Sequence, residues 1–241
     1  MVEKRTTYGQ FCPVALAAAV LAERWTPLVV RELLCGSVRF NELQRGVPRM
    51  SSALLTRRLK ELQFAGIVER RRNAGGSFEY HLTAAGRDLF PVVEKMGVWA
   101  QRWLRHDLVD TVNLDSDLLM WDIRRNAVAK SPPRDGRYVA EFRLSGVPVS
   151  RRRYWLVFER GVVDLCYRNP GFEVDLFVEA NLRVLTQVWL GHIPLAEAVR
   201  GGRLRLDGSR SDIAAFRSWF ALSTFAPAGR QPTGQAALAA E

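Results

Sequence analysis

The chain has 241 residues, of which 48% are hydrophobic, and this is enough for two ordinary globular domains with their own cores. No run reaches the roughly 18 consecutive apolar residues that a membrane-spanning helix needs, and the short amphipathic N-terminal segment does not fit a signal peptide. We therefore expect a cytoplasmic protein without membrane contact. The formal net charge is +10, of which residues 1–105 carry +8 and residues 106–241 carry +2. This excess favours a nucleic-acid partner for the first half, with a solubilising surface as the alternative.

The first 50 residues are predicted to form three helices separated by helix-breaking residues. Apolar periodicity supports helices over residues 13–22, 27–35 and 40–45. A Trp-Thr-Pro sequence breaks the chain after the first helix, and Gly36 ends the second. The turn at 46–48 then leads into a fourth helix. A short helix, a tight turn and a second helix follow the order of a helix-turn-helix motif.

Residues 51–64 predict an amphipathic helix that Ser51 or Ser52 caps and that Gly66 ends. Its apolar stripe consists of leucines at helical spacing: Leu55, Leu59 and Leu62. Four polar side chains lie off that stripe and are candidates to reach base edges or phosphates: Ser52, Thr56, Arg57 and Lys60. Arg58 lies beside the stripe and is predicted to pair with Glu61 or Glu42.

A basic hairpin is predicted directly after this helix. Residues 67–72 form one strand, residues 73–76 the turn, and residues 78–82 the returning strand. Arg70, Arg71 and Arg72 are expected to hold phosphates, with Arg72 and Asn73 as candidates for the minor groove. His81 is expected either to pack or to contact phosphate.

One further helix is predicted from its cap at Thr83 to Leu104. Apolar residues repeat along it every three to four positions, and five of them are candidates for a dimer contact: Leu89, Val93, Met96, Trp99 and Trp103. Such a stripe is too apolar to face water. It packs either on its own domain or on the same helix of a second copy, which would make a symmetric dimer.

Residues 8–105 resemble the HxlR-type winged helix-turn-helix transcription regulators. The resemblance is carried by motifs in register along the chain: Cys12-Pro13-Val14, Trp25-Thr26, Arg31-Glu32-Leu33, Arg39 to Leu43, Ser51 to Leu62, Ala65-Gly66, Val68, Arg70, Glu79 to Thr83 and Gly86. It implies a homodimer that binds operator DNA with helix 51–64 in the major groove. It also implies that Cys12, which matches a thiol sensor in some members, is a candidate redox switch, with a buried structural thiol as the alternative.

The DNA-binding candidates combine the residues above with their flanks: Arg39, Arg49, Ser51, Ser52, Thr56, Arg57, Lys60, Arg70, Arg71, Arg72 and Asn73. Two positions depart from the family pattern. Arg49 stands where the family usually has glycine, which changes the turn and adds a cation. The Gly-rich tip of the hairpin lacks the usual prolines, and a flexible tip reads the minor groove less firmly.

After a polar linker at 106–116, the second half predicts an α+β domain over residues 117–226 and a disordered tail over 227–241. A helix at 117–129 precedes strands at 138–144, 154–159, 162–167 and 172–178. Helices at 181–190 and 194–200, a strand at 203–208 and a helix at 211–222 complete it. This order suggests helices on one side of a mostly antiparallel sheet.

The second half resembles the sterol carrier protein 2 (SCP2) type of lipid-binding domain over about residues 120–222. The motifs are Asp175 to Leu182, Trp189-Leu190-Gly191, Leu195, Ala198, Gly201, Leu204 and Leu206-Asp207-Gly208. The resemblance implies an apolar cavity between sheet and helices. Five aromatic residues are candidates to line it, with a plain core as the alternative: Trp121, Trp155, Phe177, Trp189 and Trp219.

No phosphate loop, nucleophile elbow or pair of carboxylates in a recognisable frame occurs, and no histidine has a nucleophile or metal partner at a telling spacing. The three cysteines show neither zinc-ligand spacing nor a disulfide framework. We therefore predict no enzyme activity, cofactor or metal. The favoured hypothesis is a dimeric DNA-binding repressor controlled by a small apolar effector in the second half. The alternatives are a redox regulator acting through Cys12, and a ligand-binding protein whose winged helix contacts proteins.

Overall fold

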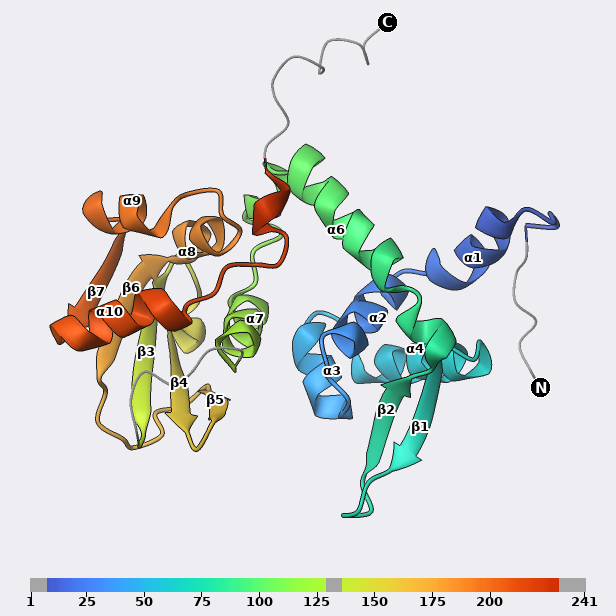
Figure 1. Ribbon diagram of the computed structural model, residues 1–241, viewed down its shortest axis with the longest axis horizontal. Coiled ribbons are helices and arrows are strands. Elements are labelled where there is room, and N and C mark those ends of the chain that lie inside the picture. The colour runs from blue at the N-terminus through green and yellow to red at the C-terminus, as the bar shows by residue number, and fades with distance from the viewer. Residues whose placement is uncertain (1–7, 129–135, 230–241) are drawn as a thin grey trace, which may run out of the picture. The chain divides into compact units, whose positions relative to one another are not determined.

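The computed structural model describes residues 8–128 and 136–229, and the chain divides into two compact units, Met1–Met96 and Gly97–Glu241 (Figure 1). The division falls inside a helix, whereas the sequence suggested a boundary at the linker 106–116. That linker holds a 3-10 helix, η1 (Asp107–Val109), and another, η3 (Ala226–Ala228), extends from the end of the predicted domain into the first two residues of the predicted tail. The rest of the predicted tail, from residue 230, lies outside the described residues.

Within residues 8–82, the first unit contains four helices and a hairpin. The helices are α1 (Pro13–Leu21), α2 (Thr26–Leu34), α3 (Phe40–Gly46) and α4 (Ser52–Phe64). The hairpin strands β1 (Val68–Arg72) and β2 (Phe78–Leu82) pair antiparallel, and Figure 1 shows them projecting beyond α2, α3 and α4. Apolar side chains of α2, α3, α4 and β1 form one core: Val29, Val30, Leu43, Leu55, Leu59, Leu62 and Val68.

Helix α1 contributes no buried residue, and Phe11 just before it is 97% exposed. The backbone turns between α1 and α2 at Trp25, which adopts a left-handed conformation with φ of 78°. No single helix within residues 8–128 and 136–229 is long and apolar enough to cross a membrane. Helices α1 and α2 meet the length and composition criteria only together, as a pair bent by 85°.

The single helix predicted from Thr83 to Leu104 is in fact two helices, α5 (Ala84–Arg87) and α6 (Phe90–Trp103). Pro91 supplies the physical reason. Proline has no N–H to donate to the carbonyl of Arg87, and its ring would collide with that carbonyl in a continuous helix. The predicted cap is confirmed, because the Thr83 hydroxyl accepts a hydrogen bond from the Gly86 N–H at 3.1 Å.

The second unit is built on a five-stranded sheet with the order β5-β4-β3-β6-β7. Its strands are β3 (Tyr138–Ser145), β4 (Arg153–Glu159), β5 (Val162–Cys166), β6 (Leu176–Asn181) and β7 (Leu204–Gly208). Only the pairing of β3 with β6 is parallel, so the mostly antiparallel α+β fold is confirmed. The turn at Arg160 and Gly161 also forms as predicted, with both residues at positive φ.

The helices of this unit are α7 (Ser116–Val128), α8 (Leu182–Trp189), α9 (Leu195–Arg200) and α10 (Arg210–Trp219), with a 3-10 turn η2 (Val149–Arg151). The last helix ends at Trp219 and not at the predicted residue 222. Likewise, the strand predicted at 172–178 begins only at Leu176. The side chain of Asp175 explains why the strand begins there. Its carboxylate accepts the Val139 N–H at 2.8 Å, so this N–H does not bond a backbone carbonyl of an earlier residue in the strand.

The sheet separates two clusters of buried side chains. Tyr138, Ala140 and Phe142 point to the face that α7, α8 and α10 cover, whereas Val139, Trp155 and Val157 form a smaller cluster on the opposite face. Helices therefore cover one side of the sheet, as predicted.

This separation corrects the predicted ligand pocket. Trp121 and Trp219 lie in the helix-covered core, and Trp189 packs against it. Trp155 lies on the other face. Phe177 lies on that face too, because Trp155 and Phe177 both pair with Glu141 of β3. The guanidinium of Arg143 lies 4.1 Å from the centre of the Phe177 ring. Because side chains alternate between the two faces of a strand, these five rings do not line one cavity.

A buried polar contact fastens the end of α6 within the second unit. Gln101 donates to the Leu190 carbonyl at 2.7 Å, and its side-chain oxygen lies 3.2 Å from Nε2 of His192. Burial, together with the positive charge of Arg105, lowers the pKa of His192 to about 4. The neutral imidazole therefore donates from Nε2 to Gln101.

We expect the second unit to lose stability as the pH falls from about 6.5 to about 4, because His192 in the unfolded chain binds a proton in that range while the folded one does not. The measurement is urea unfolding at a series of pH values. His192→Gln should flatten the pH dependence over this window. The matched variant His106→Gln changes an exposed histidine and should leave the dependence in place; equal flattening by both variants would contradict the assignment.

Candidate nucleic-acid interface

Helix α4 presents an apolar face to the core and a polar face to solvent. Its start is capped by Ser51, whose hydroxyl accepts the Leu54 N–H at 3.3 Å. Leu55, Leu59 and Leu62 are all buried, which fixes the rotation of the helix about its axis. The side chains on the opposite face are consequently exposed: Ser52, Thr56, Arg57 and Lys60.

The turn between α3 and α4 is held by side chains that the sequence analysis did not single out. Gln44 donates from its amide to the carbonyl of Met50 at 2.6 Å and to that of Val47 at 3.4 Å. Arg49, the departure from the family pattern, lies exposed in this turn, while its neighbour Met50 is buried. Gln44 therefore ties α3 to the backbone of the turn that leads into α4.

Glu32 of α2 is a fully buried carboxylate next to α3. It pairs with Arg31, and it accepts a hydrogen bond from the Ser37 hydroxyl at 3.2 Å. A Cβ atom on Gly46 would lie 1.9 Å from the carboxyl carbon of Glu32, so only glycine fits there. The sequence signal for this contact is an acidic residue within an apolar helix, followed by a glycine at the end of the next helix.

Two arginines of α4 share one carboxylate. Arg57 donates to Glu61 at 2.8 Å, and Arg58 binds the other oxygen of the same group. Arg58 is buried and also reaches Glu23 at 2.8 Å and the Arg24 carbonyl at 3.2 Å. Although partial burial opposes it, hydrogen bonds from Arg57 and Arg58 hold the pKa of Glu61 below its usual value.

Of the two acids predicted to pair with Arg58, Glu61 does so and Glu42 does not. The carboxylate of Glu42 instead accepts the N–H groups of Val38 and Arg39, both at 3.1 Å, and so caps the start of α3. Glu23, which the sequence analysis did not consider, takes the second place beside Arg58. Arg58 therefore joins α4 to the turn between α1 and α2.

The hairpin of β1 and β2, here called the wing (residues 67–82), carries stacked cations. The guanidinium groups of Arg70 and Arg72 lie 3.4 Å and 4.7 Å from the ring centre of Phe78, and Arg71 pairs with Glu69. Alternation places Arg70 and Arg72 on one face of the strand and Arg71 on the other. Phe78 is a functional candidate that the sequence analysis missed. Its position in the predicted returning strand, opposite the two arginines of the first strand, could have identified it.

The side chain of Asn73 builds the tip of the wing. It accepts the Ser77 N–H at 3.0 Å and donates to Glu79 at 3.0 Å. His81 also lies beside Glu79, at 3.2 Å, and Arg39 lies 3.7 Å from it. Asn73 is thus partly buried, whereas the other ten candidates for DNA contact are exposed: Arg39, Arg49, Ser51, Ser52, Thr56, Arg57, Lys60, Arg70, Arg71 and Arg72.

The candidate dimer residues fall into two groups along α6. Leu89, just before the helix, and Val93 pack against the core of the first unit. Met96, Trp99 and Trp103 are about half exposed, as is Phe90. The sequence analysis missed the exposed apolar residues of α1 and its flank, Phe11, Val14 and Leu16.

The cysteines of the described residues are all free thiols, and no group of three or more metal-ligating side chains occurs within the described residues. Cys12 is partly buried at the N-cap of α1, and its own carbonyl accepts the Leu16 N–H at 3.1 Å.

Comparison with known proteins identifies the first unit. The family model of the HxlR-like helix-turn-helix matches residues 20–108. The transcriptional regulator YvaP of Bacillus subtilis is 36% identical over 105 residues, which are 42% of this chain and 97% of that protein. The chain belongs to the HxlR-like helix-turn-helix family. Its relatives carry the name of transcriptional regulators, and this chain is a DNA-binding regulator of the same type.

Two solved structures of regulators are also similar to the first unit in sequence. The quinone-bound YodB of B. subtilis is 36% identical, covers 37% of this chain and 97% of its own, and has a TM-score of 0.33. The redox regulator HypR in its reduced form is 34% identical, covers 37% and 91%, and has a TM-score of 0.35. The family model ends at residue 108, so most of the second unit lies outside it.

Proposed function

We propose that this HxlR-type regulator binds double-stranded DNA sequence-specifically, with α4 in the major groove and the wing on the adjacent backbone. The observation that carries the proposal is the exposed polar face of α4, held in place by three buried leucines. Thr56 and Lys60 lie one turn apart on that face with Arg57 beside them. Arginine and lysine match guanine edges, and hydroxyl groups suit bases or phosphates.

The wing supports the same docking through charge. Arg70, Arg71 and Arg72 are exposed on one strand, and each phosphate contact releases counterions and makes the affinity depend on salt. The stacking of Arg70 and Arg72 on Phe78 restricts both guanidinium groups before DNA arrives. Asn73 is assigned to the turn itself, so Arg72 becomes the candidate for the minor groove.

We propose a homodimer as the binding species, supported by the apolar residues that the chain leaves exposed. Met96, Trp99 and Trp103 lie along α6, and Phe11 and Val14 lie at the start of α1. Exposed apolar side chains in such numbers mark interaction surfaces. Two copies would place two α4 helices in successive major grooves, on a pseudo-palindromic operator.

Repression controlled by an effector completes the proposal. A dimer on an operator blocks the polymerase by occupancy, which favours repression. The SCP2-like character of the second unit rests on its sequence resemblance and on the mostly antiparallel sheet with helices on one side. An effector of that unit acts only if its affinity differs between the DNA-competent and incompetent states.

Arg57→Ala is expected to weaken specific DNA binding by roughly 1–3 kcal/mol and to relax the preference at one base pair, because a bidentate contact is lost. The measurement is fluorescence anisotropy at fixed salt with the promoter region of the protein's own gene. Arg71→Ala should instead weaken binding to all sequences alike and reduce the salt dependence.

Arg200→Ala is the matched control, since it removes an exposed arginine of α9 in the second unit. It should leave DNA binding unchanged. Normal operator binding by Arg57→Ala would overturn the docking of α4. A wild-type protein that binds its promoter no better than random DNA would favour the alternative, in which the winged helix of a ligand-binding protein contacts other proteins.

The position of Cys12 favours redox sensing as a second candidate function. Cys12 is a free thiol that is only partly buried, so an oxidant can reach its sulfur. We expect Cys12→Ser to abolish any loss of DNA binding after treatment with diamide, while Cys35→Ser, which removes an exposed thiol, retains it. An unchanged response of Cys12→Ser removes this function.

A further inference from the structure

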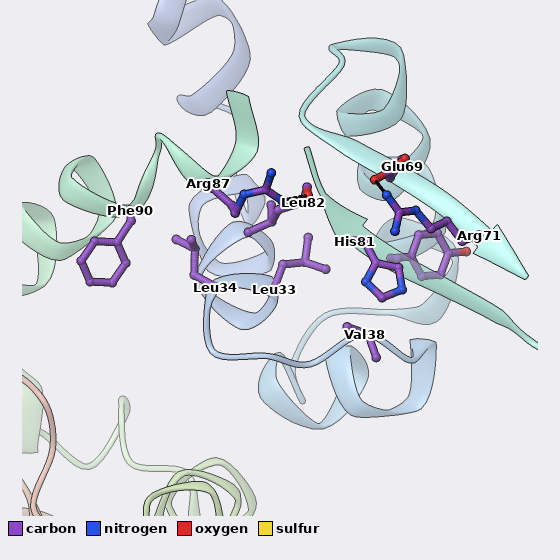
Figure 2. A pocket seen from close by; sticks show the side chains of 10 residues that line it. Leu33, Leu34, Val38, Glu69, Arg71, His81, Leu82, Arg87 and Phe90 are labelled. Atoms are coloured by element: carbon purple, nitrogen blue, oxygen red, sulfur yellow. Dashed lines mark hydrogen bonds and ion pairs between the residues drawn. The ribbon is translucent and has the colours of Figure 1, made fainter. Parts of the chain in front are cut away.

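The first unit contains a pocket behind the wing that is separate from the candidate sites above, although Arg71 belongs both to its lining and to the candidates for DNA contact. Its volume is about 460 Å³, and its lining comes from the end of α2, both wing strands, α5 and the start of α6. Figure 2 shows Phe90 at one end of the pocket and Arg71 at the other. A pocket of this size lies within the range of small-molecule sites.

One part of the wall is apolar. Leu33 and Leu34 of α2 and Leu82 of β2 lie along it in Figure 2, and the exposed ring of Phe90 ends it. About half of the surface of Phe90 faces solvent, so a molecule in the pocket would bury part of this ring. This wall suits the ring or chain of an apolar molecule.

The other part of the wall carries charge. Arg87 donates from Nη1 to the Leu82 carbonyl at 2.7 Å, which is the only hydrogen bond of its side chain within the part of the chain described. That bond holds the planar guanidinium at the wall while further N–H donors remain to bind an anion. A carboxylate matches the fork of these donors in geometry and charge.

The charge of the pocket limits the ligand to one negative group. Arg71 is paired with Glu69, so these two lining residues neutralise each other. Arg87 is the remaining guanidinium of the lining, and no carboxylate within the described residues pairs with it. A second anionic group would have to lie beside the Glu69 carboxylate, which repels it.

We propose that this pocket binds a small molecule with an apolar body and a single carboxylate, and that its occupancy weakens DNA binding. The coupling rests on the proposed function. Glu69, Arg71, Tyr80 and His81 belong to the wing, so the ligand touches the element that is to lie on the DNA backbone. A ligand that shifts Arg71 away from phosphate binds the free protein more tightly than the DNA complex.

The test uses the full chain and two probes of the same shape, 2-naphthoate and its neutral counterpart 2-naphthylmethanol, in calorimetric titrations at pH 7. Naphthoate should bind saturably, and the alcohol should bind at least about tenfold more weakly because it lacks the charge-assisted hydrogen bonds. Arg87→Gln should weaken naphthoate by about tenfold, and Arg200→Gln, the matched control, should not change it.

Phe90→Ala tests the apolar wall separately and should weaken both probes. Equal affinity of naphthoate for Arg87→Gln and the wild type, equal affinity of the two probes, or no saturable binding at 10 mM overturns the proposal. Anisotropy with promoter DNA then tests the coupling: naphthoate should lower the DNA affinity of the wild type and not that of Arg87→Gln.

These measurements separate the two proposals. DNA binding that is specific and indifferent to naphthoate overturns the coupling and leaves the proposed function in place. Specific DNA binding is measured first, in the absence of naphthoate. A protein that does not bind its promoter specifically overturns the proposed function, whatever the naphthoate titrations give.

Discussion

Gly46→Ala should lower the free energy of unfolding of the first unit by about 3 kcal/mol, because the added methyl group overpacks a buried site whose neighbours cannot move aside easily. The new methyl group would lie 1.9 Å from the carboxyl carbon of Glu32, which is itself fully buried. Moving that carboxylate also breaks its hydrogen bond with Ser37. Because Gly46 ends the helix before α4, DNA binding should fall with stability. Urea unfolding followed by circular dichroism measures the loss.

Gly75→Ala is the control for this substitution. Its Cβ would meet Asn73 Oδ1 at 3.5 Å, an ordinary contact, so stability should change little. Adding Glu32→Ala to Gly46→Ala should recover part of the loss, because the group that clashes is removed and the two changes are coupled. A double variant as unstable as the sum of both single variants would contradict the clash.

Local features of the fold were predictable from the sequence because their causes lie within a few residues. The Ser51 cap, the leucine face of α4 and the Arg160-Gly161 turn all formed as predicted. The break between α5 and α6 has an equally local cause in Pro91. It was missed because the apolar period runs through it without interruption.

Features that depend on residues far apart in the chain were not predictable in the same way. Arg58 pairs with Glu61, one of the two expected partners, and also with Glu23, 35 positions earlier, which was not expected. Nothing in either local pattern indicates that α4 meets the turn after α1. Similarly, the five aromatic rings of the second half share chemistry, yet strand parity puts Trp155 and Trp219 on opposite sides of one sheet.

The difference between local and long-range causes also explains why the candidate DNA-binding face was easier to predict than the pockets. Exposure on α4 follows from helical periodicity, since three core leucines determine which side faces solvent. A pocket requires side chains from several elements to converge. The pocket behind the wing joins residues 33 and 34 to residues 69–90, and no periodicity connects them.

Trp219→Ala should destabilise the second unit by about 3–5 kcal/mol, the cost of deleting a large ring from a close-packed core. Trp219 is 1% exposed and contacts four aromatic rings, Tyr138, Phe142, Phe158 and Phe216, with ring centres 4.9–6.4 Å away. Edge-to-face pairs of this kind add to the area that is buried. Thermal unfolding and urea titration of the full chain should both report the loss.

Trp219→Phe separates packing from polar recognition. The indole Nε1 has no hydrogen-bond partner among the described residues, so replacing the indole with a phenyl ring abandons no hydrogen bond. The loss should therefore be much smaller than for alanine. If Trp219 instead lined a ligand site and donated a hydrogen bond to the ligand, Trp219→Phe would keep the stability of the protein and lose ligand binding. A core role predicts that the substitutions change only the stability, in proportion to the volume of the side chain that is removed.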